Sequence, residues 1–255
     1  MQAQRLPAAR GAFWLAAGFA LYRRNPLLLG MLTLGYLMTV VAFGLLQPIG
    51  QFLMPLALPA LTVLVANGFR ALDLAPSRTL PRGVLTSGLA EHRGALLRLG
   101  GLHLAGTMVV LAADLMLEGG HWSSLMLDTS DETVQMMHML RLMALASPLL
   151  LAFWFAPLLT AWAGVTAAKS MFFSFIAAWR NWRAFLAYGM AVLLIGVVLP
   201  GLLMIGAGLI SQVLAEVVSV ALRTVLLMVF APVLMASVYL SYRDVFMAPP
   251  PVADE

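Results

Sequence analysis

The chain has 255 residues, of which 62% are hydrophobic and only 10% are charged, against roughly 25% charged residues in an ordinary soluble domain. Because a soluble fold of this size needs a charged shell, the composition excludes a soluble globular enzyme and also a disordered chain. The chain contains no cysteine, which excludes disulfides, thiolate metal sites and cysteine nucleophiles. The sequence therefore predicts an all-α, polytopic helical membrane protein.

The first apolar stretch, Ala12 to Leu21, is too short to cross a membrane. Ten helical residues rise only about 15 Å, whereas the hydrocarbon core is about 30 Å thick. The stretch ends in Tyr22-Arg23-Arg24-Asn25-Pro26 and not in a small-residue cleavage site, so it does not resemble a cleaved signal peptide. We expect residues 1–10 to form a cytoplasmic tail and Gly11–Tyr22 to form an interfacial helix along the membrane surface.

Six later stretches are each long and apolar enough to cross a membrane as a helix. They are Pro26–Leu46, Phe52–Leu72, Leu96–Leu117, Leu142–Val165, Ala184–Ile210 and Val217–Tyr242. Their apolar residues run continuously and do not alternate, which favours helices over barrel strands. We therefore expect a single membrane domain at residues 11–243 with six transmembrane helices, followed by a cytoplasmic tail at residues 244–255.

The basic residues predict how this domain is oriented. Of the 15 Lys and Arg residues, all but Arg141 and Arg223 lie on one side of the layout. Short cytoplasmic loops of membrane proteins carry the excess of Lys and Arg, so we expect both termini to be cytoplasmic. The basic residues stand in ones and twos at membrane edges, which favours anionic lipid headgroups at the cytoplasmic face, and not nucleic acid, as their partner.

The spacing of prolines suggests an internal repeat. Each even-numbered span holds a proline followed eleven or twelve residues later by a basic residue: Pro59 and Arg70, Pro157 and Lys169, and Pro232 and Arg243. A proline in a membrane helix frees a carbonyl group and kinks the helix, so we expect a kink at each. The pattern suggests three helical hairpins, each preceded by an interfacial helix and a polar elbow, at residues 11–72, 80–169 and 170–243. The alternative is that ordinary membrane prolines and positive-inside charges imitate a repeat.

Few polar side chains fall inside the predicted spans. Asp114, Glu216 and Arg223 lie near the outer ends, where side chains reach the interface readily. Asn67 and His103 lie deepest; each either lines a pore or makes a hydrogen-bonded contact between helices, and we favour the contact. No carboxylate stands at mid-membrane, where ion-coupled transport usually places one.

The sequence carries no motif for an enzyme, a cofactor or a metal. It lacks the GxSxG, P-loop and HExxH patterns, and His103 has no second histidine at its depth to ligate haem. Met136, Met139 and Met143 near His138 raise the alternative of a copper site. Their spacing places the three methionines on one helix face, so we favour packing and expect neither cofactor nor metal.

Basic, aromatic and amide residues gather at two of the elbows. They are Arg23, Arg24 and Asn25 before the first span, and Trp179, Arg180, Asn181, Trp182 and Arg183 before the fifth. Aromatic rings beside cations suit the headgroup layer, where we also expect Trp14. We predict that these elbows bind anionic lipid or a partner membrane protein and that both asparagines cap or bridge helix ends. The alternative is that the arginines only fix orientation during insertion.

Five short strings of the sequence are distinctive: Arg23-Arg24-Asn25-Pro26, Ala152-Phe153-Trp154-Phe155-Ala156-Pro157-Leu158-Leu159, Phe172-Phe173-Ser174-Phe175, Arg180-Asn181-Trp182-Arg183-Ala184-Phe185 and Ser241-Tyr242-Arg243-Asp244-Val245-Phe246. They resemble an uncharacterised family of integral membrane proteins from betaproteobacteria. The resemblance extends from about Gly11 to Phe246. It implies the bacterial inner membrane as the location, and it implies no activity and no catalytic residues.

Two hypotheses for the function follow. The leading one is a non-enzymatic membrane module that organises lipid or a partner membrane protein through its elbows. The alternative is a transporter or channel for a small solute, which a threefold repeat of kinked helices would support. A water-filled path across the bundle would distinguish the second from the first.

Overall fold

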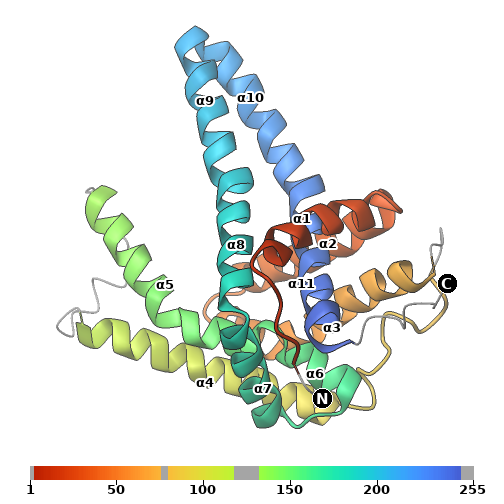
Figure 1. Cartoon of the computed structure of the whole chain (residues 1–255). Coiled ribbons are helices and arrows are strands. Elements are labelled where there is room, and N and C mark those ends of the chain that lie inside the picture. Colours follow the sequence, from red (N-terminus) through yellow and green to blue (C-terminus); the bar gives the residue numbers. More distant parts are fainter. Residues whose placement is uncertain (1–2, 76–79, 118–131, 248–255) are drawn as a thin grey trace.

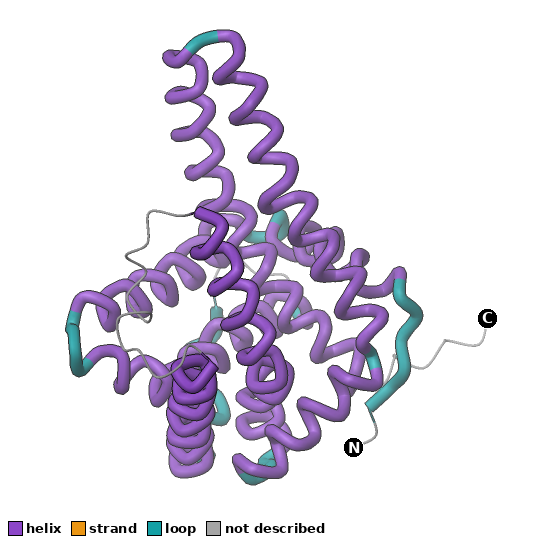
Figure 2. Tube along the Cα trace, turned by 90° about the vertical axis from the view of Figure 1, so that its left-hand side faces the viewer, coloured by secondary structure: helices purple, strands orange, loops and turns teal. Residues whose placement is uncertain are grey.

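The computed structural model describes residues 3–75, 80–117 and 132–247, and every regular element in these ranges is a helix (Figures 1 and 2). The elements are α1 (Ala9–Tyr22), α2 (Pro26–Leu45), α3 (Gly50–Leu74), α4 (Arg93–Leu117), α5 (Glu132–Trp154), α6 (Ala156–Ala163), α7 (Ala167–Arg180), α8 (Trp182–Leu193), the π-helix η2 (Leu194–Val198), α9 (Leu199–Ile210), α10 (Gln212–Val225), the π-helix η3 (Leu226–Phe230) and α11 (Ala231–Phe246). The all-α prediction is confirmed.

Six helical stretches of the described chain are long and apolar enough to span a membrane, as predicted. They are Pro26–Leu45, Gly50–Leu74, Arg93–Leu117, Thr133–Ala163, Trp182–Ile210 and Gln212–Phe246. The largest difference is at the fourth, where helix α5 begins ten residues before the predicted Leu142. These ten residues are polar enough to leave the apolar window, yet they contain neither Gly nor Pro, so the helix continues through them.

The six spans pair into three hairpins that diverge from a common base. The hairpins are α2 with α3, α4 with α5 and α6, and α8–α9 with α10–α11. The third points upward in both views, and α4 with α5 points to the left in Figure 1. We call the base the end where α2, α4 and α8 begin and where α3, α6 and α11 end.

Buried side chains concentrate at this base. In α3 they cluster between Val63 and Leu72, and in α11 between Pro232 and Val245, whereas α10 buries none and α9 buries only Ala207. The outer halves of the hairpins therefore present apolar side chains that no described part of the chain covers. Such a surface is stable against lipid tails, which are as apolar as the side chains themselves.

Helix α1 is wedged into the base between α8 and α11. Gly11 and Gly18 make this close approach possible, because a Cβ atom at either position would overlap the backbone carbonyl of Ala184 or Val233. Trp14, which we expected in the headgroup layer, is completely buried between them. That expectation is wrong because Gly11 and Gly18 let α1 approach α8 and α11 closely, so that the helix face that carries Trp14 packs into the core.

The second hairpin lacks the interfacial helix that the repeat predicts. Helices α1 and α7 precede the first and third hairpins, but residues 82–92 form consecutive turns before α4. Two glycines in this segment, Gly83 and Gly88, have φ of 78° and 75°, a left-handed conformation that other residues rarely adopt. The segment is instead held by Asn67, whose Nδ2 donates to the carbonyls of Leu85 and Ser87 at 2.9 Å.

The three repeat prolines lie in different local settings. Pro59 is inside the continuous helix α3, whereas Pro157 is the second residue of α6, which follows an interruption at Phe155. Pro232 is the second residue of α11, which directly follows η3. Ser174 of α7 provides hydrogen-bond partners for backbone groups at the interruption at Phe155. Its Oγ accepts from the Phe155 N–H at 2.9 Å and donates to the Leu151 carbonyl at 2.8 Å. A neighbouring serine is a common partner for backbone groups freed near a membrane proline.

Candidate functional site

The first elbow, between α1 and α2, is tied to the end of α3. Asn25 caps α2, since its Oδ1 accepts from the Leu28 N–H at 3.2 Å. Arg24 donates to the Leu72 and Asp73 carbonyls at 3.3 Å and lies 3.6 Å from the Asp73 carboxylate. Arg23 is exposed beside the Phe19 ring. Of the two arginines predicted to bind lipid here, Arg24 is therefore engaged within the chain and Arg23 faces outward.

The second elbow, between α7 and α8, is centred on a buried asparagine. Asn181 is only 2% exposed. Its Oδ1 accepts from the Leu6 N–H at 2.8 Å, and its Nδ2 donates to the Gln4 and Ala177 carbonyls at 2.9 Å. Asn181 thus clamps the N-terminal segment onto the elbow. The predicted bridging role is confirmed, and the polar atoms of Asn181 are not available to a lipid.

The other four residues of the second elbow form an exposed aromatic–basic patch. We use this name for Trp179, Arg180, Trp182 and Arg183. The two tryptophans are 63% and 54% exposed, and the Arg183 guanidinium lies over the Trp182 ring at 5.5 Å. Arg180 is in the last turn of α7, where the helix dipole favours a cation. Side chains of this kind, held at the surface of a membrane protein, are suited to headgroups.

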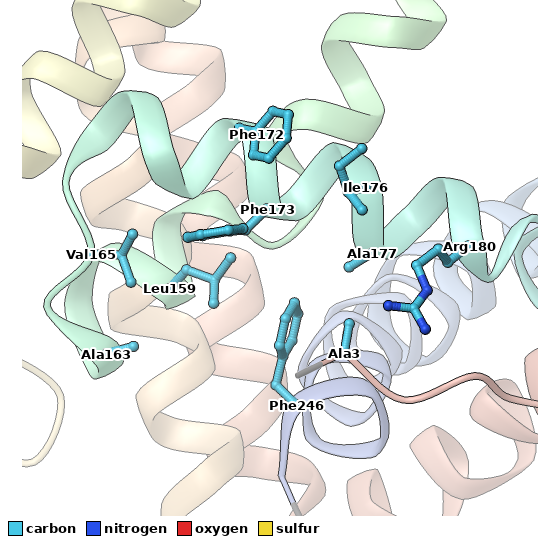
Figure 3. Close-up of a pocket in the computed structure, with 10 residues that line it drawn as sticks. All are labelled: Ala3, Leu159, Ala163, Val165, Phe172, Phe173, Ile176, Ala177, Arg180 and Phe246. Atoms are coloured by element: carbon cyan, nitrogen blue, oxygen red, sulfur yellow. The ribbon is translucent and has the colours of Figure 1, made fainter. Parts of the chain in front are cut away.

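An apolar groove of about 570 Å³ lies beside this patch. It is enclosed by α6, α7, the end of α11 and the N-terminal segment, and its lining is Ala3, Leu159, Ala163, Val165, Phe172, Phe173, Ile176, Ala177, Arg180 and Phe246. In Figure 3 Phe173, Leu159 and Phe246 surround the space, and the Arg180 guanidinium lies at one end beside Ala3. Among the lining side chains only Arg180 is charged.

Two aspartates at the base make an ion network that sequence reasoning missed. Asp73, at the end of α3, accepts from Arg243 Nη1 at 2.8 Å and from the Tyr239 hydroxyl at 2.9 Å. Together with Arg24 these contacts join α3, α11 and the first elbow. The carboxylate is mostly buried, so its partners compensate for lost hydration.

Asp244 is the second aspartate of the network. It accepts from Arg10 Nε at 2.6 Å and from the Trp14 indole at 3.0 Å, and it lies 3.4 Å from Arg243. These bonds fix α1 to α11 at Asp244, which we predicted as the first residue of the cytoplasmic tail, whereas α11 continues to Phe246. A usable signal was present: Asp73 and Asp244 each stand within three residues of an arginine at the basic end of a span.

A small cavity brings two of the three repeat prolines together. Its volume is about 100 Å³, and it is lined by Tyr36, Leu58, Pro59, Thr62, His103, Phe153 and Pro157. His103, one of the two deep polar residues of the spans, borders this cavity. Its ring stacks on Phe153 with ring centroids 4.4 Å apart. Asn67, by contrast, makes the predicted helix contact, accepting from the Trp162 indole at 2.8 Å. Pro232 does not line the cavity.

A third buried carboxylate pairs the outer parts of α4 and α5. Asp114 is completely buried and accepts from Arg141 Nε at 2.7 Å, with His138 Nε2 at 3.7 Å. The sequence placed Asp114 and Arg141 near the outer side, but it did not indicate that they pair. This contact holds the hairpin together, because a carboxylate and a guanidinium lose less on burial when they are matched.

Within the described ranges no group of three or more His, Asp or Glu side chains is placed to hold a metal ion. Met136, Met139 and Met143 are all exposed on α5, so the predicted packing against the protein core is wrong for these three. They project from α5, which packs mainly against α4, α6 and α7. Their apolar thioethers are compatible with a lipid-facing surface.

The chain is similar to a protein from Burkholderia thailandensis whose name is probable inner membrane protein. The two are 32% identical over 206 residues, which cover 74% of each chain. No family model matches the sequence, and no solved structure matches it.

Proposed function

The chain belongs to the same family as this Burkholderia thailandensis protein and is a multi-pass inner membrane protein, and we propose that it is a non-enzymatic module that holds anionic lipid at the cytoplasmic face. The observation that carries the proposal is the exposed aromatic–basic patch at the base. Two tryptophans and two arginines there have the geometry that headgroups require: apolar ring area beside unburied positive charge.

The proposed orientation places the base in the cytoplasm. The structure gathers the elbow ends of all three hairpins at one end of the molecule, and 13 of the 15 basic residues lie on that side of the layout. The positive-inside rule then assigns this end to the cytoplasm. Both ends of the described chain would then be cytoplasmic, because residues 3–6 and the end of α11 meet at the base, where the Gln4 N–H donates to the Val245 carbonyl.

The test replaces three of the four elbow arginines, Arg23, Arg180 and Arg183, by Gln. Arg24 is left unchanged because its contacts with Asp73 are structural. Each cation near an anionic surface contributes about 1 kcal/mol, so the triple variant is expected to lose up to about 3 kcal/mol of anionic-lipid association. Native mass spectrometry of the purified protein counts the retained lipids. The matched control is the triple Gln variant of Arg82, Arg93 and Arg98, which removes the same charge from the same side of the layout.

The proposal predicts that the elbow variant retains fewer anionic lipids than the control variant, with both correctly inserted. Equal retention by the elbow variant and the wild type would contradict it and would leave the arginines as orientation signals. Loss of a co-purifying membrane protein in place of lipid would assign the patch to a partner.

A transporter or channel for a small solute is the second candidate, and the cavity at Pro59 and Pro157 favours it. Tyr36, Thr62 and His103 contribute polar groups there, inside three different spans. The chain has no cysteine, so a single Thr62→Cys substitution can be probed with a charged thiol reagent. Modification from the aqueous side would support a water-filled path, and no modification would contradict it.

A further inference from the structure

We propose that the apolar groove binds one acyl chain of an anionic phospholipid, with the lipid phosphate on Arg180. This inference rests on the proposed function and assigns a specific site to it. The groove would act as a built pocket for a single lipid, distinct from the shell of lipids that any membrane protein recruits.

The lining defines the chemistry of the occupant. Nine of the ten lining residues are apolar, so a sugar or another polar solute would leave its hydrogen-bonding groups unpaired and would be disfavoured. The volume of about 570 Å³ falls within the range of about 300–1,000 Å³ that is typical of ligand sites. An alkyl chain is the ligand that such an apolar space accepts with the least loss of hydration.

The one charged lining residue, Arg180, indicates that the headgroup of the bound lipid is anionic. Arg180 is exposed, and within residues 3–75, 80–117 and 132–247 no carboxylate forms an ion pair with it. Its guanidinium lies at one end of the groove beside Ala3 (Figure 3), and the residue before it in the chain is the exposed Trp179. A phosphate there would receive a charge-assisted hydrogen bond while the tryptophan lay at headgroup depth.

The groove wall is held in place by contacts already described. Asn181 clamps Gln4 and Leu6, which keeps Ala3 over the groove, and Ser174 anchors α7 to the interruption at Phe155. The lining is thus preorganised on α6, α7 and α11, so less ordering accompanies ligand binding. Preorganisation of this kind distinguishes a site from the exposed apolar faces of the hairpin tips.

The experiment fills the groove. Ala163→Trp places an indole in the space, and Val165→Phe is a second filling variant. Ala42→Trp, at an exposed position of α2, is the matched control for the same change. Delipidated protein in detergent is incubated with phosphatidylglycerol or with phosphatidylcholine, and native mass spectrometry measures the fraction that carries one lipid. Size-exclusion profiles show that each variant is folded.

The expected result is one phosphatidylglycerol retained by the wild type and by Ala42→Trp, and at least about tenfold less by both filling variants. Arg180→Gln should reduce retention about fivefold, the effect of one cation near a phosphate, and Arg180→Lys should restore most of it. The groove variants keep all four elbow arginines, so their failure and that of the surface proposal are distinguishable. Unchanged retention in both filling variants, or equal retention of phosphatidylcholine, would overturn the site.

Discussion

Two asparagines at equivalent elbows show how environment decides the role of a residue. Asn25 makes a capping bond at the surface of α2, whereas Asn181 is buried and bonds to backbone groups that are more than 170 residues away along the chain. The sequence predicted capping or bridging for both, because asparagine bonds readily to local backbone. It did not distinguish them, because the partners of Asn181 come from the N-terminal segment, which only the fold brings there.

Replacing each asparagine by alanine tests this difference. Asn25→Ala should cost about 1 kcal/mol, as the loss of a helix cap does. Asn181→Ala should cost about 2–4 kcal/mol, because it leaves the Leu6 N–H and the Gln4 carbonyl without their partner. Thermal unfolding in detergent measures both changes. Equal shifts for the two variants would contradict the clamp.

At the scale of elements, the close packing of α1 is the feature that organises the base. It depends on two glycines seven residues apart, on one face of α1, which lie against the backbones of α8 and α11. The ion network reinforces this packing, because Asp244 of α11 binds Arg10 and Trp14 of α1. Helix α1 is therefore part of the core of the membrane domain.

A single methyl group tests the packing. Gly18→Ala should lower the unfolding temperature, since its Cβ would lie 2.8 Å from the Val233 carbonyl oxygen and the two helices would have to separate. Gly30→Ala in α2 is the control: nothing lies within 4 Å of its Cβ position, and alanine is the better helix former. A stability loss as large for Gly30→Ala as for Gly18→Ala would show that helix packing is not the cause.

Helix positions could be predicted from the sequence, whereas the contacts between helices could not. Continuous apolar runs define the spans, so the predicted bounds of α2 and α4 lie within three residues of those observed. The surface exposure of Trp179 and Trp182 also followed from their chemistry. The pairing of Asp73 with Arg243 and of Asp114 with Arg141 depends on how the helices pack, so the sequence did not identify these partners. The groove could not be predicted either, because it combines residues 3, 159–180 and 246, which only the packing of the helices brings together.

At the scale of the whole molecule, the three hairpins share one base and have separate tips. The base holds the ion network, the aromatic core and the groove, and the tips carry exposed apolar helices. This division matches a membrane protein in which the elbow end is a closely packed platform and the spans face lipid. It also places every residue of the proposed lipid site at the same end.

Labelling of single cysteines tests the orientation of this platform, since the natural chain has none. Ile49→Cys lies in the exposed turn between α2 and α3, and Ala168→Cys lies at the exposed start of α7 near the base. An impermeant thiol reagent should label Ile49→Cys from the periplasmic side, and it should label Ala168→Cys only after the membrane is opened. Labelling of both from the same side would overturn the proposed layout.

The central claim, that the base holds anionic lipid, is tested most directly by extracting the wild-type protein with its surrounding lipid in polymer-bounded discs. Mass spectrometry then compares the lipids in the discs with those of the bulk inner membrane. The account predicts enrichment of anionic phospholipid around the wild type, because the elbows present unburied cations beside exposed tryptophan rings. A lipid composition identical to that of the bulk membrane would contradict it.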